Sequence, residues 1–192
     1  MNKQFSGLYY VGAAIRKADK DTRVFVFDMD STLTYDPDRS IIYPDKEAYF
    51  DAARDFPPNM RLSNYARFFA SKGHSVVIAT ARPPSRLDES IKWLNDNNIP
   101  FDQIMLSTGE VPSSLAKQSM LKDLKSYYKS VECLYDDSPY NIEAAELQGV
   151  YGRHVPTNDQ YWELNPELVT KLWLILTPAK ALTMSLQSHA LA

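Results

Sequence analysis

The chain has 192 residues, of which 44% are hydrophobic and 23% charged, and its formal net charge is −3. This length and composition are typical of one globular domain, and the nearly balanced charge, without a run of five like charges, argues against an extended nucleic-acid-binding surface. The single cysteine, Cys133, excludes an internal disulfide and is typical of a reducing compartment. The N-terminus lacks the apolar stretch of a secretory signal, and apolar runs such as residues 172–176 are too short to span a bilayer. We therefore expect one cytoplasmic domain over residues 1–192, with no membrane segment.

Strands and helices alternate in the sequence pattern. Short apolar runs rich in β-branched and aromatic residues predict strands at residues 22–28, 74–80 and 130–136, with a weaker candidate at 102–106. Helical spacing of apolar residues predicts helices at 59–73, 84–98, 113–130 and 138–149. In the third of these helices, the apolar face is expected to consist of Leu115, Met120, Leu121 and Leu124. This alternation predicts an α/β protein, a Rossmann-like three-layer sandwich with a mostly parallel central sheet.

Two segments fall outside this alternation. Residues 35–58 are polar and proline-containing, which predicts a small helical insertion, or cap, after the first predicted strand. Residues from about 165 to 192 predict a helical tail that Pro178 ends or kinks. The tail is either a last packed helix or a contact surface of a homo-oligomer.

Each strong strand ends in polar side chains: Asp28 and Asp30 after the first, Thr80 and Arg82 after the second, Asp136 and Asp137 after the last. Right-handed crossovers bring the ends of parallel strands to one edge of the sheet, so these side chains should converge. Convergent carboxylates need a cation. Their oxygen ligands favour Mg²⁺ over zinc, because the three histidines and one cysteine are scattered along the chain.

The two aspartates of "DMD" can divide the work of phosphoryl transfer between them. One carboxylate can attack phosphorus and form an aspartyl-phosphate, while the other gives a proton to the leaving oxygen and later takes one from water. Thr80 offers a hydroxyl donor for a phosphoryl oxygen, and Lys117 offers a compact positive charge near the start of its helix. Lys122 competes with Lys117 for this role, and either lysine could instead lie on the surface.

Four stretches resemble, in order, the four motifs of the haloacid dehalogenase-like (HAD-like) phosphohydrolases: "FDMDSTLT", "VVIATAR", "LAKQSMLKDL" and "CLYDDSPYNIEAAE". The resemblance covers residues 22–156. Further details are similar to the 3′-phosphatase domain of polynucleotide kinase and its phage-encoded relatives: the arginine after "TA", the insertion with "AYFDAARDFPPN", and the adjacent acidic pair. The chain departs from that subgroup, which usually has glycine in place of Ala81 and arginine in place of Ser138. It also has no Walker-type kinase sequence.

The resemblance implies roles for the four aspartates. Asp28 would be the nucleophile and a metal ligand, and Asp30 the general acid and base, with its main-chain carbonyl also touching the metal. Asp136 would bind Mg²⁺ directly, and Asp137 would bind it directly or through water. From the residues alone, an aspartate after a strand can also be a simple turn residue, and Asp137 or Ser138 can cap the helix that follows.

The resemblance also implies a phosphate-binding set. Thr80, Ala81 and Lys117 would hold the transferring phosphoryl group, and Arg82 would contact the substrate's phosphate or a neighbouring group. A surface salt bridge is the other interpretation of Arg82. An aromatic group could line a pocket for a base, although such residues more often belong to a core: Tyr9, Tyr10, Tyr43, Tyr49, Phe50 and Phe56.

The function expected from these features is that of a Mg²⁺-dependent phosphomonoesterase. Its partner would be a phosphorylated small molecule or a nucleic-acid end, and the resemblance favours a nucleotide or a nucleic-acid 3′-phosphate. A sugar or other metabolite phosphate is the alternative substrate. Two other classes compete with the phosphatase: a phospho-receiver module, in which the acidic pair would come early in the chain, and a binding protein that keeps the fold without turnover.

Overall fold

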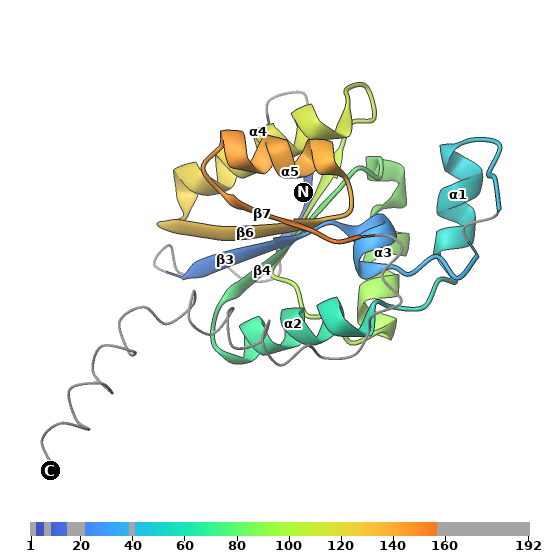
Figure 1. Ribbon diagram of the computed structural model, residues 1–192, viewed down its shortest axis with the longest axis horizontal. Coiled ribbons are helices and arrows are strands. Elements are labelled where there is room, and N and C mark those ends of the chain that lie inside the picture. Colours follow the sequence, from blue (N-terminus) through green and yellow to red (C-terminus); the bar gives the residue numbers. More distant parts are fainter. Residues whose placement is uncertain (1–2, 6–8, 15–21, 39–40, 157–192) are drawn as a thin grey trace, which may run out of the picture. The chain divides into compact units, whose positions relative to one another are not determined.

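The computed structural model describes the backbone of residues 3–5, 9–14, 22–38 and 41–156, and the side chains of the last two of these ranges. Within them, a seven-stranded sheet has the order β1-β2-β5-β4-β3-β6-β7 (Figure 1). Its strands are β1 (Lys3–Phe5), β2 (Tyr9–Ala14), β3 (Arg23–Phe27), β4 (Ser75–Thr80), β5 (Gln103–Ser107), β6 (Ser130–Asp136) and β7 (Tyr151–His154). Five neighbouring strands of the sheet are parallel, in the order β5, β4, β3, β6 and β7, which confirms the prediction of a mostly parallel sheet.

One edge of the sheet is antiparallel and was not predicted from the sequence. β2 pairs with β5 in opposite directions, with Tyr9 across from Ser107, and β1 pairs antiparallel with β2. The weak strand candidate at 102–106 is therefore an interior strand, because β5 has β4 on one side and β2 on the other. β7, at the opposite edge, is also a strand that the sequence pattern did not indicate.

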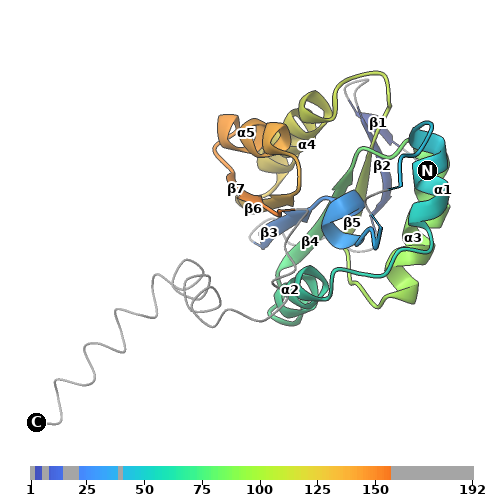
Figure 2. The same cartoon turned by 45° about the vertical axis from the view of Figure 1, so that its right-hand side comes forward.

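Helices cover both faces of the sheet and complete the predicted three-layer sandwich. α4 (Ser113–Tyr127) and α5 (Pro139–Leu147) lie on one face (Figure 1). α2 (Met60–Ser71) and α3 (Leu87–Asp96) lie on the other (Figure 2). The predicted helical insertion after the first parallel strand is present as α1 (Lys46–Ala53), which follows the irregular turn η1 (Met29–Leu33). A short turn, η2 (Pro84–Arg86), leads into α3.

The central strand β3 is anchored on both faces. Its side chains alternate, as the two-residue period of a strand requires. Val24 and Val26 join the hydrophobic cluster under α4, whereas Phe25 stacks on Phe69 of α2 with ring centroids 3.7 Å apart. Phe25 and Phe27 are both almost completely buried. Because burying one such side chain contributes about 1.5–3 kcal/mol, the end of β3 is held firmly in place.

Helix α4 buries three of the four apolar side chains that the sequence predicted, Met120, Leu121 and Leu124. Its buried side chains are Ala116, Lys117, Met120, Leu121 and Leu124. The prediction for Leu115 was wrong, since that side chain is 49% exposed. Lys117 takes a buried position because two carboxylates neutralise its charge. Rotating the helix to bury Lys117 leaves Leu115 on the outside.

The predicted helical tail at residues 165–192 lies outside the described residues, together with its suggested contact between copies. The single-domain organisation over residues 1–192 therefore stays a prediction.

Candidate active site

The strand register brings the first and last acidic motifs to one edge of the sheet. Phe27, the last residue of β3, pairs with β4 on one side and with Tyr135 of β6 on the other. Asp28 therefore leaves the sheet between the ends of β4 and β6, beside Asp136. The backbone N–H of Asp28 also donates to the carbonyl of Tyr135 at 2.9 Å, which fixes the start of the turn. The predicted convergence of strand ends is present in the structure.

The turn η1 holds Asp30 close behind Asp28. Ser31 has a φ of 59°, in the left-handed region that residues other than glycine seldom adopt. Surrounding contacts keep it there: the Ser31 N–H donates to Thr34 Oγ1 at 3.1 Å, and the Thr34 N–H donates to the Met29 carbonyl at 2.8 Å. Strained backbone that is held by its surroundings is frequent at functional sites.

Lys117 joins the ends of β3 and β6. Its Nζ donates to Asp28 Oδ1 at 2.5 Å and to Asp136 Oδ2 at 2.8 Å, and its side chain is fully buried. Burial disfavours the charged form of Lys117, but Asp136 and Asp28 outweigh that effect, so the pKa of Lys117 is raised. The competing candidate, Lys122, is exposed on the same helix. The geometry thus brings Lys117 and not Lys122 to the carboxylates.

Three carboxylates are close enough to share one cation. Ligand oxygens of Asp28, Asp136 and Asp137 all lie within 4.8 Å of one another. Mg²⁺ takes its protein ligands from carboxylates and carbonyls, so this donor set fits it. The charge count fits as well. With Asp30 there are four aspartates against two basic side chains, those of Lys117 and Arg82, which leaves a formal charge of −2.

The pKa of the Asp28 carboxyl group is affected by burial and by the neighbouring charges. Burial raises the pKa of Asp28 well above its ordinary value. The ammonium of Lys117 lowers this pKa, while the carboxylates of Asp136, Asp137 and Asp30 raise it further. A cation beside these oxygens would favour the ionised form of Asp28.

Asn141 is a site residue that the sequence analysis missed. Its Nδ2 donates to Asp136 Oδ1 at 2.9 Å, and its Oδ1 lies 3.0 Å from Ser113 Oγ at the start of α4. The Ser138 N–H donates to the same Asp136 oxygen at 2.9 Å, so both oxygens of Asp136 are held. The available signal was a polar side chain on the buried face of α5, where Asn141 precedes two buried alanines by three and four positions.

Arg82 holds the other catalytic candidate, Asp30. Its Nε donates to Asp30 Oδ2 at 2.9 Å and its Nη2 to Asp30 Oδ1 at 2.7 Å, the two-pronged geometry of a strong arginine–carboxylate pair. Nη1 donates to Ser90 Oγ at 3.2 Å, and no part of the Arg82 side chain is exposed. The predicted contact between Arg82 and a substrate phosphate stays a prediction. Its pairing with Asp30 and Ser90 is a feature that the sequence did not indicate.

Thr80 and Ala81 follow Asp28 along the same edge of the sheet. Thr80 is completely buried, and its Oγ1 accepts a hydrogen bond from the Arg82 N–H at 3.2 Å. Ala81 is half-buried and has no polar side chain, so only its backbone N–H could meet a phosphoryl oxygen. The phosphate-binding role of both residues stays a prediction.

The predicted aromatic group divides between two places. Tyr9 and Tyr10 lie on β2, where the side chains are outside the described ones. The insertion packs together the other four: Tyr43, Tyr49, Phe50 and Phe56. The Tyr49 hydroxyl reaches the turn η1, where it lies 3.3 Å from Ser31 Oγ.

Cys133 does not join the site. It is buried in β6, and burial raises the pKa of its thiol to about 12, which keeps it in the unreactive protonated form.

Among the described residues, no helix has the length and hydropathy that crossing a membrane requires.

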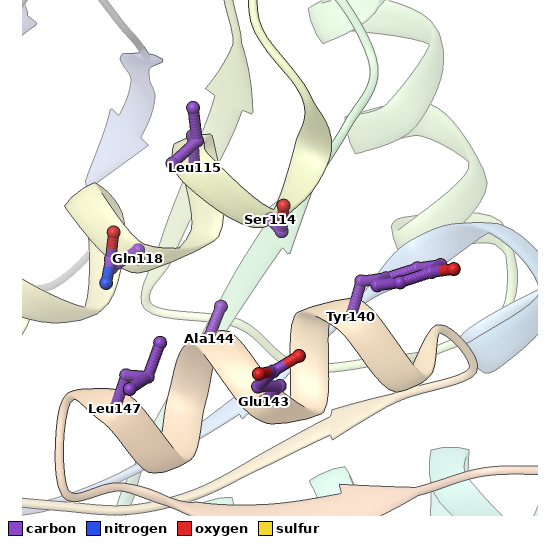
Figure 3. Close-up of a pocket in the computed structure, with 7 residues that line it drawn as sticks. All are labelled: Ser114, Leu115, Gln118, Tyr140, Glu143, Ala144 and Leu147. Carbon is purple, nitrogen blue, oxygen red and sulfur yellow. The ribbon is translucent and has the colours of Figure 1, made fainter.

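A cavity of about 220 Å³ lies between α4 and α5 (Figure 3). Its lining includes Leu115, Gln118, Tyr140 and Leu147, whereas no predicted site residue lines it. The cavity is therefore separate from the acidic cluster and takes no part in the chemistry argued from that cluster.

Comparison with known proteins gives matches in structure alone. No protein-family model matches the chain, and no curated protein matches it. Among solved structures, one of the Pnkp1/Rnl/Hen1 RNA repair complex has a TM-score of 0.60 at 18% identity, covering 77% of this chain and 47% of that chain. A second structure of the Pnkp1/Rnl/Hen1 complex has a TM-score of 0.59 at 17% identity, and the match covers 74% of this chain and 49% of that chain. The chain thus spans about half the length of these two matched chains.

A third structure matches over most of both chains. It comes from Mesorhizobium loti and is described as a HAD-like phosphatase. Its TM-score is 0.56 at 13% identity, and the match covers 79% of this chain and 81% of that chain. At identities this low, the similarity concerns the fold. The parallel sheet, its helical layers and these three matches agree with the four sequence motifs: the chain has the fold of the haloacid dehalogenase-like phosphatases.

Proposed function

We propose that the chain is a Mg²⁺-dependent phosphomonoesterase that forms an aspartyl-phosphate on Asp28. The observation that carries the proposal is a pair of charge clusters at one sheet edge. In one, Lys117 bridges Asp28 and Asp136; in the other, Arg82 grips Asp30. A buried carboxylate nucleophile, a second carboxylate for proton transfer and fixed cations are the parts that this reaction requires.

The acidic residues would hold the metal. Asp28, Asp136 and Asp137 offer carboxylate oxygens, and the resemblance would add the main-chain carbonyl of Asp30 to this all-oxygen donor set. When bound, Mg²⁺ supplies the charge neutralisation that lets an anionic phosphate approach a carboxylate. Asn141 would keep Asp136 oriented toward the ion through its hydrogen bond to Oδ1.

The reaction has two steps, both centred on phosphorus. In the first, an oxygen of Asp28 attacks phosphorus, the bond from phosphorus to the substrate oxygen breaks, and Asp30 gives that oxygen a proton. In the second, Asp30 takes a proton from water as the water oxygen attacks the same phosphorus, which releases inorganic phosphate and restores Asp28. Arg82 binds both carboxylate oxygens of Asp30 and so holds in place the group that moves the proton in each step.

The phosphoryl oxygens need donors while they carry the developing charge. Lys117 would supply one from the start of α4, and the Thr80 hydroxyl and the Ala81 backbone N–H would supply others from the end of β4. Arg82 would contact the same phosphate or a neighbouring group, in addition to Asp30 and Ser90, to which its guanidinium donates.

The substrate that we propose is a nucleotide or a nucleic-acid 3′-phosphate. The motif resemblance supports it, and two of the matched structures come from an RNA repair complex. A sugar or other metabolite phosphate is the alternative. Initial rates on 3′-phosphorylated oligonucleotides, 3′- and 5′-mononucleotides and sugar phosphates distinguish the two, and a preference for sugar phosphates would contradict the nucleotide assignment.

Turnover of a generic aryl phosphate with Mg²⁺ tests the mechanism. We expect Asp28→Asn to abolish it, and Lys117→Met to lower kcat by at least about a hundredfold, the usual effect of removing one donor to the transferring group. Lys122→Met removes an exposed lysine from the same helix and serves as the matched control, with activity unchanged. Equal activity of Asp28→Asn and the wild type would overturn the proposal.

A further inference from the structure

We propose that the insertion selects the leaving group, and that it accepts an uncharged group with an aromatic ring, the nucleoside of a mononucleotide, against Tyr43 and Tyr49. This inference rests on the proposed phosphatase function. It narrows the substrate from nucleotides and nucleic-acid ends in general to mononucleotides.

Tyr49 lies beside the turn that carries Asp30, the residue that we propose protonates the leaving oxygen. Its hydroxyl is 3.3 Å from Ser31 Oγ, and Ser31 directly follows Asp30. Burial raises the pKa of Tyr49, and the carboxylates of Asp30 and Asp28 raise it further, as expected for a phenol close to both. α1 lies beyond the end of the sheet at which β3 runs into η1 (Figure 1). Whatever is bonded to the leaving oxygen therefore lies next to this helix.

The insertion offers aromatic and apolar surface at that position. Tyr43 meets Tyr49 edge-on, with ring centroids 5.3 Å apart and an interplanar angle of 86°. Phe50 and Phe56 support Tyr49 from within and are buried, whereas both tyrosines are half-buried. Ile42, directly before Tyr43, is 92% exposed. Half-exposed tyrosines of this kind are platforms on which bases stack, and this stacking does not depend on which base is present.

The charge of the insertion opposes a nucleic-acid strand. Residues 35–58 contain six acidic and three basic residues, a formal charge of −3, which equals the net charge of the whole chain. Two arginines at the insertion are paired with its carboxylates: Arg54 with Asp51, and Arg86, reaching over from η2, with Glu47 and Asp51. Proteins that follow a strand neutralise its phosphates with lysine and arginine. This surface would repel a strand and accept a nucleoside.

The test compares substrates that differ only in the group of interest. kcat/KM is measured with Mg²⁺ for nucleoside 3′- and 5′-monophosphates, for ribose 5-phosphate, which lacks the base, and for a short 3′-phosphorylated oligonucleotide. We expect the better mononucleotide to exceed ribose 5-phosphate by about tenfold or more, the size of one base–aromatic stack. The oligonucleotide should be the poorer substrate, and increasingly so at low salt, where repulsion is least screened.

Variants assign that preference to the tyrosines. Tyr43→Ala should lower kcat/KM for the mononucleotide by about tenfold and leave ribose 5-phosphate unchanged, while Tyr49→Phe, which keeps the ring, should retain the preference. Tyr127→Ala removes a 49%-exposed tyrosine at the other end of α4 from Lys117 and should change neither substrate. Melting temperatures show whether each variant folds.

Three outcomes would overturn the inference: ribose 5-phosphate as good a substrate as the mononucleotides, equal losses on both substrates in Tyr43→Ala, or the oligonucleotide as the best substrate. If no substrate is hydrolysed, including the generic aryl phosphate, the proposed function fails instead. Binding then decides the inference. A thermal shift by the mononucleotide, absent with ribose 5-phosphate and lost in Tyr43→Ala, would support it, and equal shifts would overturn it.

Discussion

Asp28 lies in a buried cluster in which one ammonium group, that of Lys117, serves more carboxylates than it can neutralise. Asp28 and Asp136 both contact it, and Asp137 is close to both. Burial raises the pKa of Asp28 and the neighbouring carboxylates raise it further, while Asp136 and Asp28 raise the pKa of Lys117. The excess of carboxylates over ammonium groups in this cluster favours the binding of a divalent cation.

The stability of the metal-free protein should depend on the charge of Asp28. Folding raises the pKa of Asp28 from its ordinary value of 3.8, so the folded protein holds this proton more tightly than the unfolded chain does. The free energy of unfolding therefore falls as the pH rises from about 3.8 to the pKa of the folded state. Asp28→Asn removes this loss. With a chelator present to remove metal ions, we therefore expect a difference in the free energy of unfolding, variant minus wild type, that increases with pH.

Urea unfolding at a series of pH values measures this difference. Saturating Mg²⁺ should reverse its sign at neutral pH, because the ion binds the ionised carboxylates of the folded wild type. A difference that stays constant with pH, or that falls, would contradict the charge surplus at Asp28.

Arg82 should act on the reaction through Asp30. Arg82→Lys keeps the charge and loses the two-pronged grip, so Asp30 would be less well placed to protonate the leaving oxygen. We expect kcat to fall by about tenfold or more for alkyl phosphates, whose leaving oxygen needs the proton, and much less for an activated aryl phosphate.

Leaving-group dependence of kcat is the measurement for this variant. Arg67→Lys, which alters an arginine that donates to the Asn97 and Asn98 carbonyls on α3's side of the molecule, is the matched control. Equal losses for aryl and alkyl phosphates in Arg82→Lys would indicate that Arg82 acts on the phosphate itself.

At the scale of elements, Arg86 links the insertion to the helical layer that covers the sheet. Arg86 contacts Glu47 and Asp51 of α1 and also Glu89 of α3, with atoms 2.5, 2.7 and 3.0 Å apart. Its guanidinium also lies over the ring of Phe50, 5.9 Å from the centroid. This network fixes α1 beside the turn that carries Asp30.

Removing the arginine should loosen the insertion. In Arg86→Ala, amide hydrogen exchange of residues 46–53 should become faster, while α2 and α4 stay protected. The loss of stability should be only about 1 kcal/mol, because both α1 carboxylates of the network are more than half exposed. Lys92→Ala breaks an isolated surface pair on α3 and should leave exchange in α1 unchanged. Unchanged exchange in Arg86→Ala as well would show that the network does not hold the insertion.

The sequence predicted the elements that carry the site and missed the contacts that refine it. Asp28 and Asp136 could be predicted because strand ends are local patterns and parallel topology brings them together. The antiparallel β1 and β2 could not, because their pairing depends on a strand distant in the sequence. The exposure of Leu115 was also beyond prediction, since the rotation of α4 depends on the ion pairs of Lys117.

At the scale of the whole molecule, the described residues combine a firmly packed sandwich with a small helical insertion. The pairing of Arg82 with Asp30 joins residues 52 positions apart, and no residue pattern indicates it. Fold and motifs together support the proposed reaction class, whereas we propose that the choice of substrate depends on the insertion.

The most direct test of the central claim is to trap the phosphorylated nucleophile. Asp30→Asn can still accept a phosphoryl group from an activated aryl phosphate but lacks the base that activates water. Intact-mass and peptide spectra after mixing with substrate and Mg²⁺ should show one added phosphoryl group on the peptide that contains Asp28. No adduct in an enzyme whose wild type turns over, an adduct on another residue, or an adduct that persists in Asp28→Asn would contradict the account.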